Sequence, residues 1–219
     1  MTTVSHEMKT PVAASKVLLE TLCHGGRDEE TTREYLHLLS RENDRMAELA
    51  EQFLTFARLD NGLLSVSPVP CEIAPLVAEQ ISLSKPQFIC KGGSSSYSAT
   101  GSPEVVTDPA AIKVILSNLI SNSLKYGGAP PESLVESGFS GREFWISVSD
   151  NGEGISTESQ ERIFREYDRG DRKLSSSSSG LGLGLAISQR FARLLGGKIE
   201  WAPDSGSQSS RFILSLPVS

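Results

Sequence analysis

The residues best suited to covalent chemistry lie near the amino end, in a run of seven residues at 5–11 with the sequence SHEMKTP. His6 is followed at once by the carboxylate of Glu7, and Thr10 comes about one helical turn later. An imidazole is a competent nucleophile near neutral pH, and an adjacent carboxylate can orient it and accept its proton. Alone the run is weak evidence, because a histidine near a terminus is usually a solvated side chain.

The second half of the chain contains a run with the residue types of a nucleotide site, NLISNSLKY at 118–126. Its spacings of four and three place Asn118, Asn122 and Lys125 on one face of a helix. An amide oxygen can bind a hard cation such as Mg²⁺, and a lysine one turn later can contact phosphate oxygens. The alternative for this run alone is an ordinary polar face on a core helix.

Two glycine-rich runs follow. DNGEGI, at 150–155, places Asp150 at the end of an expected strand, and its two glycines permit a tight turn close to a ligand. GLGLGL, at 180–185, has glycine at alternate positions where a helix is expected to begin, which exposes N–H groups to an anion such as a triphosphate. Each has a plain alternative, a simple turn for the first run and a flexible hinge for the second.

The elements that must position these runs are expected in two groups. Residues 3–24 and 31–59 are predicted to form helices joined by a short polar connection, which makes an antiparallel hairpin. Beyond residue 64 the pattern changes to mixed helix and strand, residues 127–141 are expected to form a loop, and residues 167–179 are expected to be mobile. Further helices are predicted at 72–84, 109–126, 157–166 and 181–195, and strands at 88–91, 97–100, 105–107, 143–149, 198–202 and 211–217.

Apolar periodicity in the first helix predicts which way its histidine faces. The expected packing seam directs His6 to solvent, roughly 160° away from its centre, and a kink is expected at Pro11. Two helices alone bury too little surface for stability, so we expect the hairpin to pair with a second copy in a four-helix bundle. The seam consists of Val4, Met8, Pro11, Ser15, Leu18 and Leu22.

Composition narrows the class of partner and the compartment. The formal net charge is −6, which argues against nucleic acid and against an anionic membrane surface. The three cysteines are far apart and match no zinc spacing, so free thiols in a reducing compartment are expected. No apolar run approaches the ~20 residues that a membrane span requires. We therefore expect a cytoplasmic protein, or the cytoplasmic part of a larger membrane-bound protein.

In this order, the runs are similar to those of the sensor histidine kinases of two-component signalling. SHEMKTP resembles the phosphoacceptor box of that family, NLISNSLKY its asparagine box, and DNGEGI and GLGLGL its two glycine boxes. ERIFREYDRGD, at 161–171, resembles the box between the glycine runs, with Phe164 in place, Tyr167 where a second phenylalanine is usual, and Arg169 retained.

The resemblance implies a fold and two domains. A dimerisation and phosphoacceptor domain is expected at 1–63, built as a dimeric helical hairpin. A catalytic ATP-binding domain is expected at 64–219, an α/β two-layer sandwich of the Bergerat type with a mixed sheet and helices on one face. The implied partners are a second copy of the chain and the receiver domain of a separate response regulator.

The resemblance also implies roles for single residues. His6 would accept the γ-phosphoryl group of ATP and pass it to an aspartate of the regulator, Glu7 would take the ring proton, and Thr10 would position water for the reverse, phosphatase reaction. Asn122 would bind Mg²⁺, and Asp150 would accept a hydrogen bond from the adenine amino group. The implied nucleotide-binding set is Asn118, Asn122, Lys125, Tyr126, Asp150, Gly152, Gly154, Ile155, Arg169, Gly180, Leu181, Gly182, Leu183 and Gly184.

Two alternatives keep the fold and change the function. Gyrase, MutL and a heat-shock chaperone share this type of site but hydrolyse ATP, using a glutamate four residues before the Mg²⁺ asparagine. Asn118 occupies that place here, and an amide cannot act as a base. The other alternative is a non-catalytic dimeric scaffold, which the complete set of motifs disfavours.

Overall fold

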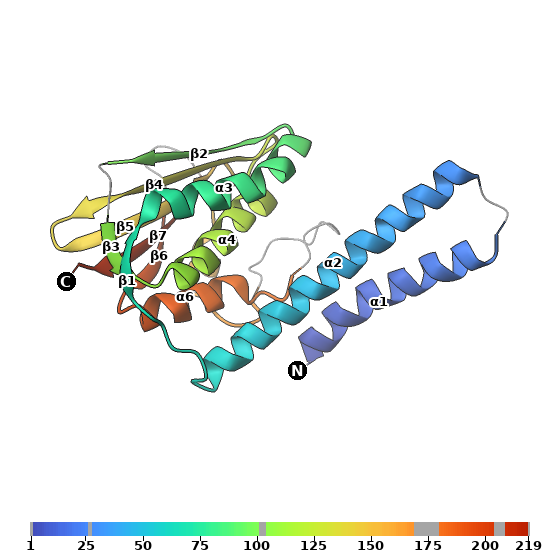
Figure 1. The fold of residues 1–219 in the computed structure, drawn as a ribbon, viewed down its shortest axis with the longest axis horizontal. Coiled ribbons are helices and arrows are strands. Elements are labelled where there is room, and N and C mark those ends of the chain that lie inside the picture. Colours follow the sequence, from blue (N-terminus) through green and yellow to red (C-terminus); the bar gives the residue numbers. More distant parts are fainter. Residues whose placement is uncertain (1, 26–27, 101–103, 169–179, 204–208, 219) are drawn as a thin grey trace.

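The computed structural model describes residues 2–25, 28–100, 104–168, 180–203 and 209–218. Two long helices, α1 (Thr2–Cys23) and α2 (Glu29–Asp60), run side by side as the hairpin that the sequence predicts (Figure 1). α1 continues through Pro11, which is buried. Asp28 begins α2 two residues earlier than expected, because its carboxylate accepts a hydrogen bond of 2.8 Å from the Thr31 N–H.

The second part of the chain is a mixed five-stranded sheet covered on one face by helices (Figure 1). β2 lies parallel to β4, and the other neighbours are antiparallel, in the order β2-β4-β5-β7-β6. A separate two-stranded sheet pairs β1 with β3. The strands are β1 (Val69–Glu72), β2 (Ser94–Ala99), β3 (Glu104–Thr107), β4 (Glu132–Ser140), β5 (Glu143–Asp150), β6 (Lys198–Pro203) and β7 (Ser210–Pro217).

The core lies between this sheet and three helices, α3 (Ile73–Cys90), α4 (Pro109–Tyr126) and α6 (Gly184–Leu194). In β5 the alternate residues Phe144 and Ile146 are buried, as the sequence pattern predicts. α4 supplies the largest apolar face of the three helices, and α5 (Thr157–Gln160) is a single short turn. Within the described residues, every helix is too short or too polar to cross a bilayer.

Two predictions about elements are wrong, and burial explains both. Residues 88–91 are not a strand, because α3 continues to Cys90 and buries Phe88 completely. Residues 127–141 are not all loop, because most of them form β4 between β2 and β5. The buried positions of β4 include Ser133 and Ser137, so its alternation is not visible as an apolar pattern.

Two helix boundaries also differ from prediction. The helix expected at 157–166 begins at Thr157, after Ser156 as its N-cap residue, but it is an α-helix only as far as Gln160. α6 begins at Gly184, three residues later than predicted. The two leucines before it, Leu181 and Leu183, are fully buried in the loop that leads into the helix. Their apolar character therefore reflects core packing rather than helix.

Asp108 joins the start of α4 to the segment that leaves the hairpin. Its Oδ1 accepts from the N–H groups of Ala110 and Ala111, at 2.8 and 3.1 Å, and its Oδ2 accepts from the Ser67 N–H at 2.7 Å. Burial raises the pKa of Asp108, but the hydrogen bonds from Ser67, Ala111 and Ala110 outweigh burial and hold the pKa below its ordinary value.

We predict that Asp108→Ala lowers the free energy of unfolding by about 1–2 kcal/mol at pH 7, the usual cost of losing a helix cap. Asp108→Asn should cost less, because the amide oxygen still accepts a hydrogen bond. The pKa of the Asp108 carboxyl group is lower in the folded than in the unfolded protein. The ionised carboxylate therefore stabilises the fold above about pH 4, and this stabilisation is lost as the pH falls through the folded pKa. Denaturant unfolding at pH 7 and pH 3 measures both effects. Identical stabilities of wild type and Asp108→Ala at pH 7 would contradict the prediction.

Candidate functional site

His6 is exposed on α1, as the apolar seam predicts. Glu7 is half-buried beside it, and Thr10 is exposed one turn later, with its hydroxyl donating to the His6 carbonyl oxygen at 3.2 Å. The Thr10 hydroxyl is thus hydrogen-bonded to the backbone of His6 on the exposed side of α1. This arrangement leaves the ring open to an approaching reactant.

The predicted nucleotide-binding residues come from three elements that pack together, α4, the end of β5 and the start of α6. Asn118, Asn122 and Lys125 share the polar face of α4, while Leu119 and Ile120 between them are buried in the core. The helix therefore carries a packing face and a polar face along the same turns.

Asn118 forms two hydrogen bonds to α6 that the sequence did not predict. Its amide nitrogen donates to the Gly184 carbonyl oxygen and to the Ser188 hydroxyl, both at 3.2 Å. A Cβ at Gly184 would lie 3.4 Å from the Asn118 amide oxygen, so the two elements approach closely at this point. Asn118 thus fixes the first turn of α6 against α4.

Asn122 lies one turn further along α4 and is half-buried. Its amide forms no hydrogen bond within the part of the chain that the structure describes. In the same described residues, no group of three His, Cys, Asp or Glu side chains is arranged to bind a metal ion. An amide oxygen is a suitable ligand for Mg²⁺, which usually keeps several waters and binds substrate phosphates as well. The donor chemistry of Asn122 therefore fits such an ion.

Asp150 ends β5 and is buried, with 8% of its surface exposed. Its Oδ1 accepts from the Gly152 N–H at 2.9 Å, which closes the turn that the DNG sequence predicts. A Cβ at Gly152 would lie only 2.2 Å from the Tyr126 carbonyl oxygen, so the glycine is required by the end of α4. Gly154 adopts a φ of 75°, a conformation that favours glycine. The turn therefore brings Asp150 beside the last turn of α4.

The second glycine run approaches the same helix from the other side. Gly182 has a φ of 68°, and a Cβ there would lie 2.8 Å from the Asp168 carbonyl oxygen. Its own carbonyl accepts from the Tyr167 N–H at 3.1 Å. Among the described residues, no side chain caps the first N–H groups of α6. Arg169 and most of the segment expected to be mobile, residues 167–179, lie outside the described residues.

A cluster around Arg190 on α6 joins this part of the chain to the hairpin. The guanidinium pairs with Asp60 at 2.9 Å and with Glu166, and it lies 4.6 Å from the centre of the Phe56 ring. The Phe56 ring in turn meets the Tyr167 ring edge-on at 6.1 Å. Burial lowers the pKa of Arg190, but hydrogen bonds and charges from Asp60 and Glu166 outweigh burial and raise it. Sequence reasoning missed this cluster because its members are far apart in the chain.

Two family models match this chain, one in the hairpin and one in the α/β part. Residues 1–62 match the family model of the His Kinase A (phospho-acceptor) domain. Residues 107–219 match the model described as histidine kinase-, DNA gyrase B-, and HSP90-like ATPase. The sensor-like histidine kinase SenX3 of Mycobacterium tuberculosis is 33% identical over 222 residues, which cover 98% of this chain and 52% of that protein. The chain thus spans about half the length of the curated relatives it matches.

Solved structures show the same fold. The histidine kinase AdeS of Acinetobacter baumannii superposes with a TM-score of 0.76 at 20% identity, covering 98% of each chain. The histidine kinase ThkA, solved in complex with the response regulator protein TrrA, gives a TM-score of 0.75 at 19% identity, covering 99% of this chain and 60% of that one. The fold likeness therefore extends over both the hairpin and the α/β part.

Proposed function

The chain belongs to the sensor histidine kinase family, and from this premise we propose that it is an ATP-dependent protein-histidine autokinase with His6 as its phosphoacceptor. The strongest support is the exposed imidazole of His6 within the segment that matches the phosphoacceptor model. We propose a domain boundary between residues 63 and 64, just after the phosphoacceptor match ends at residue 62.

In the proposed reaction, a ring nitrogen of His6 attacks the γ-phosphorus of ATP. A P–N bond forms, the bond from the γ-phosphorus to the bridging oxygen breaks, and ADP leaves. Glu7, next to His6 and half-buried, accepts the ring proton. The phosphoryl group then passes to an aspartate of a response regulator. A water positioned by Thr10 would serve the reverse, phosphatase reaction on that regulator.

The residues around α4 would bind and align the nucleotide. Asp150 would accept from the adenine amino group, Lys125 would contact phosphate oxygens, and Tyr126 would pack near the base. Asn122 would hold Mg²⁺, with Asn118 beside it. The metal, when bound, supplies charge neutralisation at the phosphates.

The glycine runs complete the proposed site. In the second run, residues 180–184, no side chain of the described part of the chain caps the amino end of α6, which suits this end to a phosphate group. In the first run, Gly152 and Gly154 would let the backbone approach the base, with Ile155 beside them. Arg169 keeps a proposed role at the nucleotide that rests on the motif alone. This set defines a site for ATP on the catalytic domain.

The hydrolytic alternative is weaker for a physical reason. Asn118 occupies the position of the glutamate that acts as a base in the ATP-hydrolysing relatives. An amide cannot take a proton from the attacking water. In addition, its amide nitrogen is occupied by Gly184 and Ser188, so the side chain is held as part of the α4–α6 contact. Autokinase activity remains the better-supported function.

We predict that His6→Ala abolishes incorporation of label from γ-labelled ATP with Mg²⁺, because the accepting nitrogen is removed. Binding of a non-hydrolysable ATP analogue should be unchanged. His37→Ala, an exposed histidine on α2, is the matched control and should retain labelling. The label should be acid-labile, as a phosphoramidate is. Retained labelling in His6→Ala would refute His6 as the acceptor.

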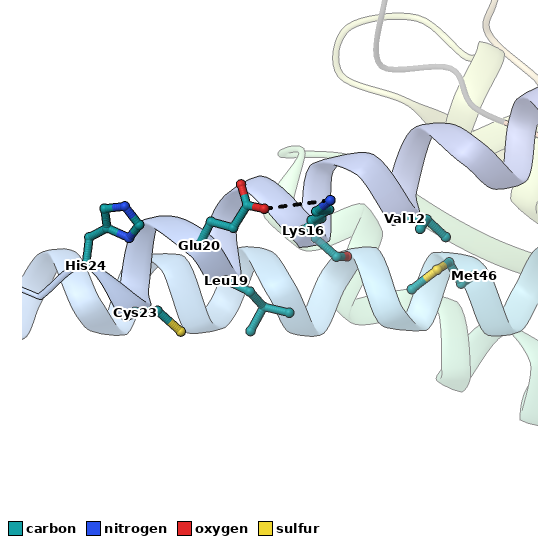
Figure 2. Close-up of a pocket in the computed structure, with 8 residues that line it drawn as sticks. Val12, Lys16, Leu19, Glu20, Cys23, His24 and Met46 are labelled. Carbon is teal, nitrogen blue, oxygen red and sulfur yellow. Dashed lines mark ion pairs between the residues drawn. The ribbon is translucent and has the colours of Figure 1, made fainter.

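The hairpin offers a surface for a second copy of the chain, and we include a homodimer in the proposal. A groove of about 550 Å³ lies along α1 and α2, lined by Val12, Leu19 and Met46 among others (Figure 2). Lys16 and Glu20 pair at its edge at 3.8 Å. Further apolar side chains of the hairpin are also exposed, namely Val17, Leu36, Leu38, Phe53 and Leu54. A second hairpin would cover the groove and complete a four-helix bundle.

The proposal also includes the compartment. A cytoplasmic location is consistent with three free cysteines and with ATP as substrate. The regulator would be a separate protein that the phosphorylated hairpin meets in the same compartment. Direct measurement of the compartment, by fractionation of cells that express the chain, would test this part.

We predict that the wild type sediments as a dimer at micromolar concentration and that Leu19→Lys shifts it toward monomer, because a charge would be buried in the groove. Leu19 is 51% exposed in the single chain, so the substitution should leave the isolated hairpin intact. Leu63→Lys is the control, since Leu63 is 73% exposed and lies outside the groove. A monomeric wild type would overturn the dimer.

A further inference from the structure

The segment between α4 and β4 is held by one side chain, the amide of Asn151. We call this segment, residues 127–131, the proline loop. The Oδ1 atom of Asn151 accepts from the N–H groups of Gly128 and Glu132, both at 2.9 Å. Its Nδ2 atom donates to the Pro130 carbonyl oxygen, also at 2.9 Å. A single residue of the DNG turn thus binds two backbone groups of the loop and the first N–H group of β4.

The proline loop begins where α4 ends, so the same bonds restrain the last turn of the helix. The Gly127 N–H donates to the Ser123 carbonyl oxygen at 2.8 Å, which joins the loop to the helix end. A Cβ at Gly127 would lie 3.2 Å from the Asn151 Oδ1, and one at Gly128 would lie 2.9 Å from the Asn151 carbonyl oxygen. The loop and the turn at Asn151 therefore approach without room for side chains.

The opposite side of the loop is fixed to the sheet edge. The Pro131 carbonyl oxygen accepts from the Ser94 N–H at 3.0 Å, at the start of β2. A Cβ at Gly93 would lie only 2.0 Å from that same oxygen. Lys91, just after α3, donates to the Leu124 carbonyl oxygen of α4 at 2.9 Å. The end of α4 is thus anchored on one side by α3 and β2 and on the other by Asn151.

We propose that Asn151 is a positioning residue for ATP binding, an inference that rests on the proposed function. Asp150 is fixed by β5, whereas Lys125 and Tyr126 are fixed by the last turn of α4. Asn151 links these two elements through the proline loop, and so sets where Lys125 and Tyr126 lie relative to Asp150. Because binding groups must be held within a fraction of an ångström of their places, a freed loop weakens affinity without removing a nucleotide contact.

The first test measures the affinity of the full chain for a non-hydrolysable ATP analogue with Mg²⁺ by calorimetric titration. Asn151→Ala should weaken binding about tenfold, the usual scale for loss of a residue that orients ligand-binding groups. Asn43→Ala, an exposed asparagine of α2, is the matched control and should bind as the wild type does. If the wild type fails to bind, the proposed function fails. If the wild type binds and Asn151→Ala binds equally well, the positioning role is overturned.

A double-mutant cycle separates positioning from a general loss of stability. If Asn151 acts by placing Lys125, then Lys125→Ala combined with Asn151→Ala should weaken binding by less than the product of the two single effects. Effects that multiply would overturn the proposal. All titrations are made at a temperature where circular dichroism shows each variant to be folded.

A second variant keeps the proposal testable if Asn151→Ala does not fold. Gly128→Ala retains the Asn151 amide, but its new Cβ would lie 3.0 Å from the Asn151 Nδ2, so the loop must move away. It should weaken binding in the same direction and show the same coupling to Lys125→Ala. Wild-type affinity in Gly128→Ala would count against the proposal.

Discussion

The structure depends on one helix, α4, which packs in the core with one face and carries the proposed binding residues on the other. α4 buries Ile115 and Leu119 against the sheet, and the same turns present Asn118 and Asn122 on the polar face. Rotation of α4 about its axis would expose buried apolar surface to water. Because burial of apolar surface contributes ~25 cal/mol per Å², such a rotation is unfavourable. The apolar face of α4 therefore fixes the orientation of the proposed ATP-binding residues. The Asp150 turn and the start of α6 are then fitted around the helix by close backbone contacts at Gly152 and Gly184.

α6 connects this site to the hairpin. Its Ser188 hydroxyl accepts from Asn118 of α4, and two residues later Arg190 pairs with Asp60 of α2 and lies over the Phe56 ring. The proposed reaction needs the nucleotide brought to a histidine on the other helix of the hairpin, so the position of the catalytic domain on α2 matters to the chemistry. Among the described residues, the Arg190 cluster is one contact that holds α6 against α2 in this position. Tyr167, with a φ of 62°, belongs to the same cluster and is the first residue of the segment, 167–179, that the sequence predicts to be mobile.

Sequence reasoning succeeded where a local rule decides the structure. The helix that begins at Pro109, the strand over most of β5 and the exposed position of His6 on α1 all follow from short-range pattern. The hairpin likewise follows from the sequence pattern, whereas the mixed sheet with helices on one face was implied by the family resemblance. β4 was missed because buried serines disguise its alternation, and the strand expected at 88–91 was wrong because tertiary burial of Phe88 extends α3. The bonds of Asn151 and Arg190 join segments from about 20 to 130 residues apart, and no local pattern signals such contacts. The catalytic and binding roles assigned to single residues stay predictions.

The central claim is that the polar face of α4 and the two glycine runs form one ATP site. Amide hydrogen exchange of the full chain, with and without a non-hydrolysable ATP analogue and Mg²⁺, tests it most directly. The account predicts that the nucleotide slows exchange together in residues 122–128, 150–155 and 180–186, and leaves the middle of α2 unchanged. Protection confined to the hairpin, or no protection in any of these three segments, would contradict the account.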